Sequence, residues 1–141
     1  MLNMIVDVLA YAALGTILMA FVSWVFDLIV PYDFHQDIAD GNKAAGWVCA
    51  GIFIGIGYLL HCVIADYSIA EELPLLTGIC DTVIWALIAL VLLVAVYFLL
   101  DLILFRKINF NEEIQKGNEA CGIVVFGIIL GLCFIISAVV M

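Results

Sequence analysis

The sequence predicts an all-α integral membrane protein, with four transmembrane helices built as two parallel two-helix repeats. Two observations carry this prediction: an apolar composition and a motif that occurs twice. Of the 141 residues, 68% are hydrophobic and only 12% are charged, and the mean hydropathy is +1.33. So few charged side chains cannot cover a water-soluble surface, so lipid must solvate most of the chain.

Four uncharged runs supply the predicted helices. They span residues 8–26, 44–65, 82–100 and 120–141. Each run is about long enough to cross roughly 30 Å of hydrocarbon as an α-helix. Strands of a membrane β-barrel would be about half as long and would alternate polar with apolar residues. The runs therefore favour helices over a barrel.

The basic residues predict the orientation. All four lie between the first and second runs or between the third and fourth: Lys43, Arg106, Lys107 and Lys116. Loops rich in Lys and Arg tend to stay in the cytoplasm. We therefore expect a multi-pass protein with these two loops in the cytoplasm and both termini outside.

The second half of the chain repeats the first. Phe34 aligns with Phe110, 76 residues later, and "DGNKAAGWVCAGIFIG" aligns at the same offset with "KGNEACGIVVFGIILG". We expect one membrane domain over residues 1–141, with repeat 1 at about 1–66 and repeat 2 at about 75–141. Each unit crosses the membrane twice, so both copies have the same orientation, related by a pseudo-two-fold axis along the membrane normal.

The segments "FHQDIADGN" and "FNEEIQKGN" predict short interfacial helices in the cytoplasmic loops. Phe and Ile stand four residues apart among polar residues, which is typical of an amphipathic helix at a membrane surface. Gly41 and Gly117 suit the left-handed turn that ends such a helix, and Asn42 and Asn118 suit the N-cap of the next span. A ligand-binding role for the Gly-Asn pair is the alternative to this structural interpretation.

Glycines at matching positions predict close helix packing. Each second span of a unit carries a GxxxG pair, and small residues let helices in lipid approach one another. The second and fourth helices are therefore expected to pack on each other or on a neighbouring subunit. The predicted structural motif comprises Gly41, Asn42, Gly46, Gly51, Gly55, Gly117, Asn118, Gly122, Gly127 and Gly131.

Ionisable residues near the spans offer the few candidates for chemistry. Asp27 and Asp101 are each followed by further apolar residues, so they are a possible ion path, with a neighbouring Lys or Arg as a possible partner. The spacing Asp33-x-His35-x-Asp37 is too loose to predict a metal site. No metal, cofactor or catalytic residue is predicted, no catalytic set or nucleic-acid-binding patch is evident, and we expect no enzymatic activity.

The motifs "GNKAAGWVCAGIFIG" and "GNEACGIVVFG", together with "PYDF" at residues 31–34, resemble the domain of unknown function 350 family. The resemblance covers nearly the whole chain and implies a small protein of the bacterial inner membrane. It implies location and topology, and no reaction.

Two functions remain open at this point. The first is a non-enzymatic, oligomeric scaffold whose cytoplasmic loops recruit a protein partner, and this is the leading hypothesis. The alternative is a small cation-conducting channel or transport subunit with an axial pore. The spans contain few polar groups to replace the hydration shell of an ion, which favours the scaffold.

Overall fold

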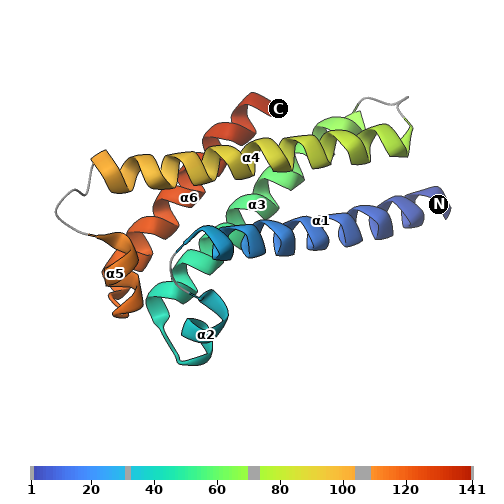
Figure 1. Cartoon of the computed structure of the whole chain (residues 1–141). Helices are drawn as coiled ribbons and strands as arrows, with labels where there is room; N and C mark the ends of the chain where they lie inside the picture. Colours follow the sequence, from blue (N-terminus) through green and yellow to red (C-terminus); the bar gives the residue numbers. More distant parts are fainter. Residues whose placement is uncertain (1, 31–32, 70–73, 104–108, 141) are drawn as a thin grey trace.

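The computed structural model describes residues 2–30, 33–69, 74–103 and 109–140. Within these ranges all regular structure is helical and no strand occurs. A long, a short and a long helix follow one another twice along the chain (Figure 1). They are α1 (Leu2–Ile29), α2 (Phe34–Ala39), α3 (Lys43–Ile69), α4 (Leu75–Ile103), α5 (Phe110–Gln115) and α6 (Glu119–Val140).

The four long helices are the membrane spans, which confirms the prediction of a four-helix membrane protein. Their apolar stretches, each long enough to cross a bilayer, run over Ile5–Ile29, Lys43–Ala65, Leu75–Leu99 and Glu119–Val139. A helix satisfies every backbone hydrogen bond within itself, which a lipid environment demands. Two of the four stretches, Ile5–Ile29 and Leu75–Leu99, extend several residues beyond an uncharged run, because the helix continues through charged residues such as Asp7.

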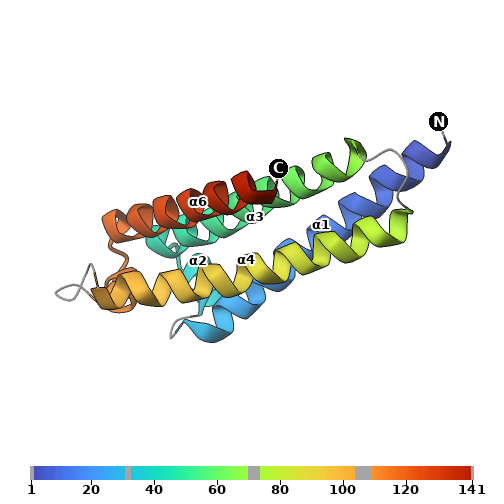
Figure 2. The same ribbon diagram turned by 90° about the horizontal axis from the view of Figure 1, so that it is seen from above.

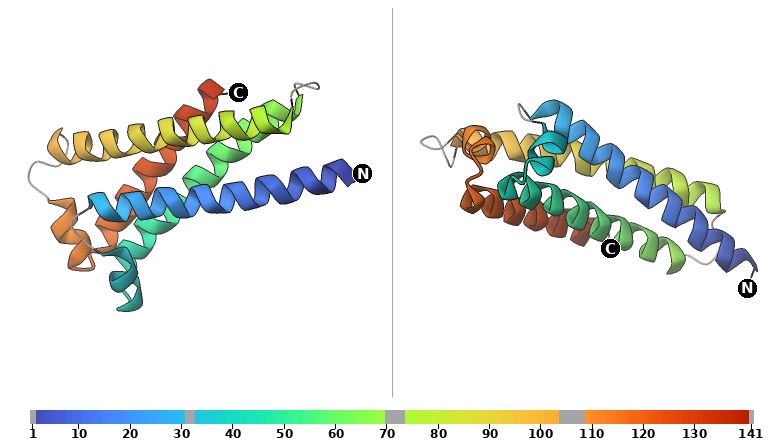
Figure 3. Two further views of the ribbon diagram at one scale, coloured as in Figure 1. Left: turned by 45° about the vertical axis from the view of Figure 1, so that its right-hand side comes forward. Right: turned by 90° about the horizontal axis from the view of Figure 1, so that it is seen from below.

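The spans form two layers. Figure 2 shows α3 and α6 together in one layer and α1 and α4 in the other. The view from below in Figure 3 shows the same division. α3 and α6 make by far the most extensive contact of any helix pair in the described chain. They run in the same direction, side by side, with α2 and α5 together at the end where both begin (Figure 1).

The core lies where the two layers meet. Ile52, Ile56 and Leu59 of α3 are fully buried, and so is Ala89 of α4. Next to the short helices, the ring of Phe26 packs against Phe34 at 6.1 Å and edge-on against Tyr97 at 5.2 Å. This aromatic group joins α1, α2 and α4, and so fixes the end of the bundle from which α2 projects.

Candidate functional site

Two matching turns shape the polar end of the bundle, which we call the polar corner (residues 33–43 and 109–119). Gly41 has a φ of 81° and Gly117 a φ of 79°. After α2, the amide of Gly41 donates to the carbonyl of Ile38 (3.0 Å), and the amide of Asn42 donates to that of Asp37 (2.8 Å). This pair of bonds is the Schellman motif, which requires a left-handed residue and therefore favours glycine.

The same pair of bonds ends α5. The amide of Gly117 donates to Ile114 at 2.9 Å, and the amide of Asn118 donates to Glu113 at 2.9 Å. Both short helices also begin alike, because Asp33 and Asn109 each accept a bond from a backbone amide three residues later. The polar corner therefore consists of two similarly built helix–turn units.

The two asparagines that follow the glycines make different bonds. Oδ1 of Asn42 accepts from the amides of Ala44 (3.0 Å) and Ala45 (3.3 Å), which caps α3. Its Nδ2 donates to the carbonyl oxygen of Ile114 in the other half at 2.8 Å. Nδ2 of Asn118 instead donates to Oε2 of Glu113 at 2.8 Å, within its own half. Both asparagines directly precede a span and accept its first backbone bond, from the amide of Gly46 (3.1 Å) and of Gly122 (3.2 Å), but their side chains bond to different groups.

Further polar contacts tie the starts of α3 and α6 together. Nε1 of Trp47 donates to Oε1 of Glu119 at 3.2 Å, and Nζ of Lys43 lies 3.9 Å from Oε2 of the same carboxylate. The indole of Trp47 also packs edge-on against Phe126 at 5.3 Å. The sequence does not predict these contacts. Lys43 and Glu119 occupy equivalent positions in the two repeats, and no motif indicates that they pair.

On α5, the Glu113 carboxylate has two partners. It accepts from Asn118 and, at 3.0 Å, from Nζ of Lys116. The bond from Asn118 and then the bond and charge of Lys116 hold the pKa of Glu113 below its usual range. The corresponding residue of α2, Asp37, has one carboxylate oxygen that is buried without a hydrogen-bond partner. The two units of the polar corner thus differ electrostatically.

Three of the predicted glycines lie where α3 and α6 touch. A Cβ atom on Gly122 would lie 2.6 Å from the carbonyl oxygen of Ala44. One on Gly51 would lie 3.2 Å from the Cα of Phe126, and one on Gly55 would lie 2.8 Å from Sγ of Cys133. A Cβ atom on Gly122 would collide with backbone, and one on Gly51 or Gly55 would force Phe126 or Cys133 to shift, so these glycines allow the close approach of the two helices.

The remaining packing glycines do not take part in this contact. A Cβ atom on Gly127, Gly131 or Gly46 would meet no atom within 4 Å. The two GxxxG pairs therefore have different environments within one chain, although the repeat predicts the same one. The reason is that α3 and α6 meet through faces that do not correspond, as described below.

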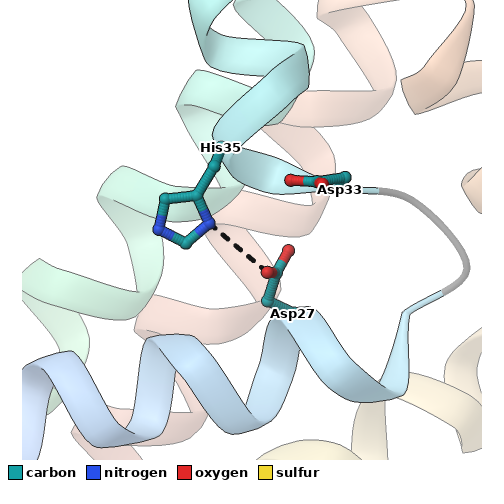
Figure 4. A group of neighbouring side chains, drawn as sticks. All are labelled: Asp27, Asp33 and His35. Atoms are coloured by element: carbon teal, nitrogen blue, oxygen red, sulfur yellow. Dashed lines mark ion pairs between the residues drawn. The ribbon is translucent and has the colours of Figure 1, made fainter.

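Asp27 lies at the junction of α1 and α2 (Figure 4). Its Oδ1 accepts the backbone amide of Phe34 at 2.8 Å, and its Oδ2 lies 3.4 Å from Nδ1 of His35. Among the described residues, the ionisable partner of Asp27 is therefore His35, because the chain turns back and brings its imidazole to this carboxylate. Asp101, the other half of the predicted ion path, has a side chain outside the described residues.

Asp27, Asp33 and His35 form the one group of potential metal ligands in the described part of the chain. One ligand atom from each lies within 4.8 Å of the others. Two carboxylates and an imidazole can hold a divalent cation. However, Oδ1 of both aspartates already accepts a backbone amide, and the side chain of His35 is 80% exposed. Fastening α2 to α1 accounts for this geometry.

Taken together, the helices and the polar corner define a multi-pass helical membrane protein. The family model "Domain of Unknown Function (DUF350)" matches residues 1–140, so the chain belongs to this family. The resemblance found from the repeated motif is thereby confirmed.

Two relatives agree with this assignment. The chain is 26% identical over 136 residues to the UPF0719 transmembrane protein YshE of Bacillus subtilis (strain 168), covering 96% of this chain and 94% of that protein. It is 22% identical over 131 residues to a UPF0719 transmembrane protein of Aquifex aeolicus (strain VF5). This second match covers 93% of the present chain but only 48% of the Aquifex protein. No solved structure matches the chain significantly.

Proposed function

We propose that this protein is a non-enzymatic scaffold of the bacterial inner membrane, whose polar corner recruits a cytoplasmic protein partner. The orientation rests on the basic residues: Lys43 and Lys116 lie in the polar corner, and Arg106 and Lys107 lie in the loop that leads into it. The polar corner then faces the cytoplasm, with α2 and α5 at the membrane surface, and both termini lie outside.

The observation that carries the proposal is the shape and charge of the polar corner. Its two helix–turn units are held together by the Asn42–Ile114 bond and by the Trp47–Glu119 bond. Six acidic and two basic residues lie in its two segments. A pre-organised surface loses little entropy on binding, and an excess of negative charge favours a partner with a basic surface. The acidic residues are Asp33, Asp37, Asp40, Glu112, Glu113 and Glu119.

The geometry of Asp27 supports the scaffold over the channel. Both of its oxygens face groups within the turn between α1 and α2, and its side chain is only 17% exposed. A carboxylate that lines a conduction path must offer its oxygens to passing ions. The channel therefore stays the alternative, and the contacts that Asp27 makes with the described residues favour the scaffold.

Site-specific photo-crosslinking in cells tests the proposal. A photoreactive residue at Gln36 or Glu112, both exposed in the polar corner, should capture the same cytoplasmic protein. The same residue at Ile135, which is 68% exposed on the apolar surface of α6, is the matched control and should capture lipid. Reversing the charge of Glu112 should weaken the capture, most visibly at low salt. Identical products at all three positions would contradict the proposal, and cation flux through liposomes holding the pure protein would favour the channel.

A further inference from the structure

α3 and α6 meet through two faces that do not correspond in the repeat. α3 contributes what we call its glycine face, and α6 contributes what we call its mixed face. At the glycines between these faces, Gly122 lies against Ala44, Gly51 against Phe126 and Gly55 against Cys133. The glycine face of α3 is Ala44, Val48, Gly51 and Gly55, and the mixed face of α6 is Gly122, Phe126, Ile129 and Cys133.

The counterparts of these faces, 76 residues away, are open. Val48 is fully buried, whereas its counterpart Val124 is 41% exposed. Ile129 is 1% exposed, whereas its counterpart Phe53 is 41% exposed. The glycine face of α6 is Ala120, Val124, Gly127 and Gly131, and the mixed face of α3 is Gly46, Ala50, Phe53 and Gly57.

We propose that a second copy of this chain covers these open faces, with the glycine face of α6 in one copy packed on the mixed face of α3 in the next. The contact would repeat, between copies, the packing that α3 and α6 make within one chain. Six of its eight residues are Gly or Ala, which is the composition of a close helix contact in lipid. Among these, Gly57 already touches Sδ of Met19, at 3.5 Å from its Cβ position, and the other glycines of the open faces have no such neighbour.

The polar corner shows the same one-sided pattern. Asn42 reaches across to the carbonyl of Ile114, which is fully buried, while the counterpart Ile38 is 44% exposed. In the proposed contact, Asn118 of one copy reaches the carbonyl of Ile38 in the next. The side-chain amide of Asn118 carries two hydrogens, so it can keep its bond to Glu113. The bond that Asn42 makes to Ile114 within one chain would thus have a counterpart between two chains.

The geometry predicts more than a dimer. The two faces of a helix are offset by two residues, which places them about 200° apart around its axis. Each copy therefore has one open face on either side of its α3–α6 pair and can bind two neighbours. Such a head-to-tail contact forms a ring or a row, whereas a two-fold dimer would join identical faces.

Crosslinking of two tagged versions tests this assembly. In a background without natural cysteines, Ala50→Cys is placed in one version and Gly127→Cys in the other, and the two are co-expressed. This pair is the counterpart of the Gly51–Phe126 contact. We expect a disulfide between the two different tags and at least about a tenfold lower yield when either variant is expressed alone. Disulfides of Gly127→Cys with itself, or none in any combination, would overturn the proposal.

A second measurement covers the case in which the cysteine-free background does not fold. Gly127→Leu in the natural chain adds a side chain where the chain itself has open space. It should abolish the oligomer in nanodiscs or mild detergent without lowering the melting temperature of the monomer. Gly51→Leu, the matched control, should lower that temperature because it separates α3 from α6. An oligomer that survives Gly127→Leu, or a monomeric natural chain under all conditions, would contradict the inference.

This inference rests on the proposed function only in that both require a membrane-embedded chain. Photo-crosslinks from Gln36 to a cytoplasmic protein report on the scaffold, whereas the Ala50–Gly127 disulfide reports on self-assembly. Either test can fail while the other succeeds.

Discussion

Asn42, at the start of α3, donates its side-chain amide to the backbone carbonyl of Ile114, 72 residues later, at 2.8 Å. The same side chain caps its own helix through Oδ1. One residue thus stabilises the N-terminus of α3 and fastens the two halves of the polar corner together.

This double role predicts an order of stabilities. Asn42→Ala removes the cap and the bond between the halves, so it should cost about 1 kcal/mol for the cap and about 1 kcal/mol more for the bond. Asn42→Asp keeps an acceptor for the cap and loses the donor. Its stability should therefore lie between that of the natural chain and that of Asn42→Ala. Thermal unfolding in detergent measures the order, with Asn118→Ala, which lacks the bond across the halves, as the control. A stability of Asn42→Asp equal to that of the natural chain would show that the bond to Ile114 contributes nothing, whereas equal effects of Asn42→Ala and Asn42→Asp would show that the cap contributes nothing.

The glycines of α3 and α6 predict opposite effects of one substitution. Gly122→Ala places a Cβ atom against the backbone of Ala44 and should cost about 1–3 kcal/mol through overpacking. Gly46→Ala, its counterpart in the repeat, meets no atom within 4 Å and should be neutral or stabilise by up to about 1 kcal/mol, because alanine favours the helix. Melting temperatures of the two variants in the same detergent give the comparison. Similar destabilisation by both would mean that the helices meet symmetrically.

The spans could be predicted from the sequence because lipid imposes one simple rule on each of them. A run of about 20 apolar residues must form a helix there, and the four long helices confirm it. The Gly-Asn turns could also be predicted, because Gly41 and Gly117 adopt the left-handed conformation that the two backbone bonds at the end of each short helix require.

The way in which the halves meet could not be predicted. Gly51 and Gly127 occupy equivalent positions in the repeat. However, the contact between α3 and α6 uses the glycine face of one helix only. The sequence around the two glycines does not indicate which helix that is. The partner of Asp27 was missed for a related reason. His35 follows it by eight residues, and only the path of the turn between α1 and α2 brings them to 3.4 Å.

The lowered pKa of Glu113 predicts acid sensitivity of the α5–α6 turn. A carboxylate with a lowered folded-state pKa stabilises the fold above its unfolded value, near 4.5, and this contribution is lost as the pH falls through the folded value. Lowering the pH from about 6 to about 3.5 should therefore destabilise the natural chain more than Glu113→Gln. Glu112→Gln, which removes a neighbouring charge but leaves the Asn118–Glu113 bond, should behave like the natural chain. If Glu113→Gln keeps the full pH dependence, the bonds from Asn118 and Lys116 do not favour the charged form.

The orientation of the polar corner decides whether it can meet a cytoplasmic partner at all. In a background without natural cysteines, Gln36→Cys lies within α2, and Glu72→Cys lies in the sequence between the second and third spans. With both termini outside, a membrane-impermeant thiol reagent added to intact spheroplasts should label Glu72→Cys and leave Gln36→Cys unlabelled until the membrane is opened. Opening the membrane before labelling is the control, since both variants should then react. Labelling of Gln36→Cys from outside would place the acidic polar corner outside the cell and would remove the basis for a cytoplasmic partner, whereas the packing of α3 on α6 would stand.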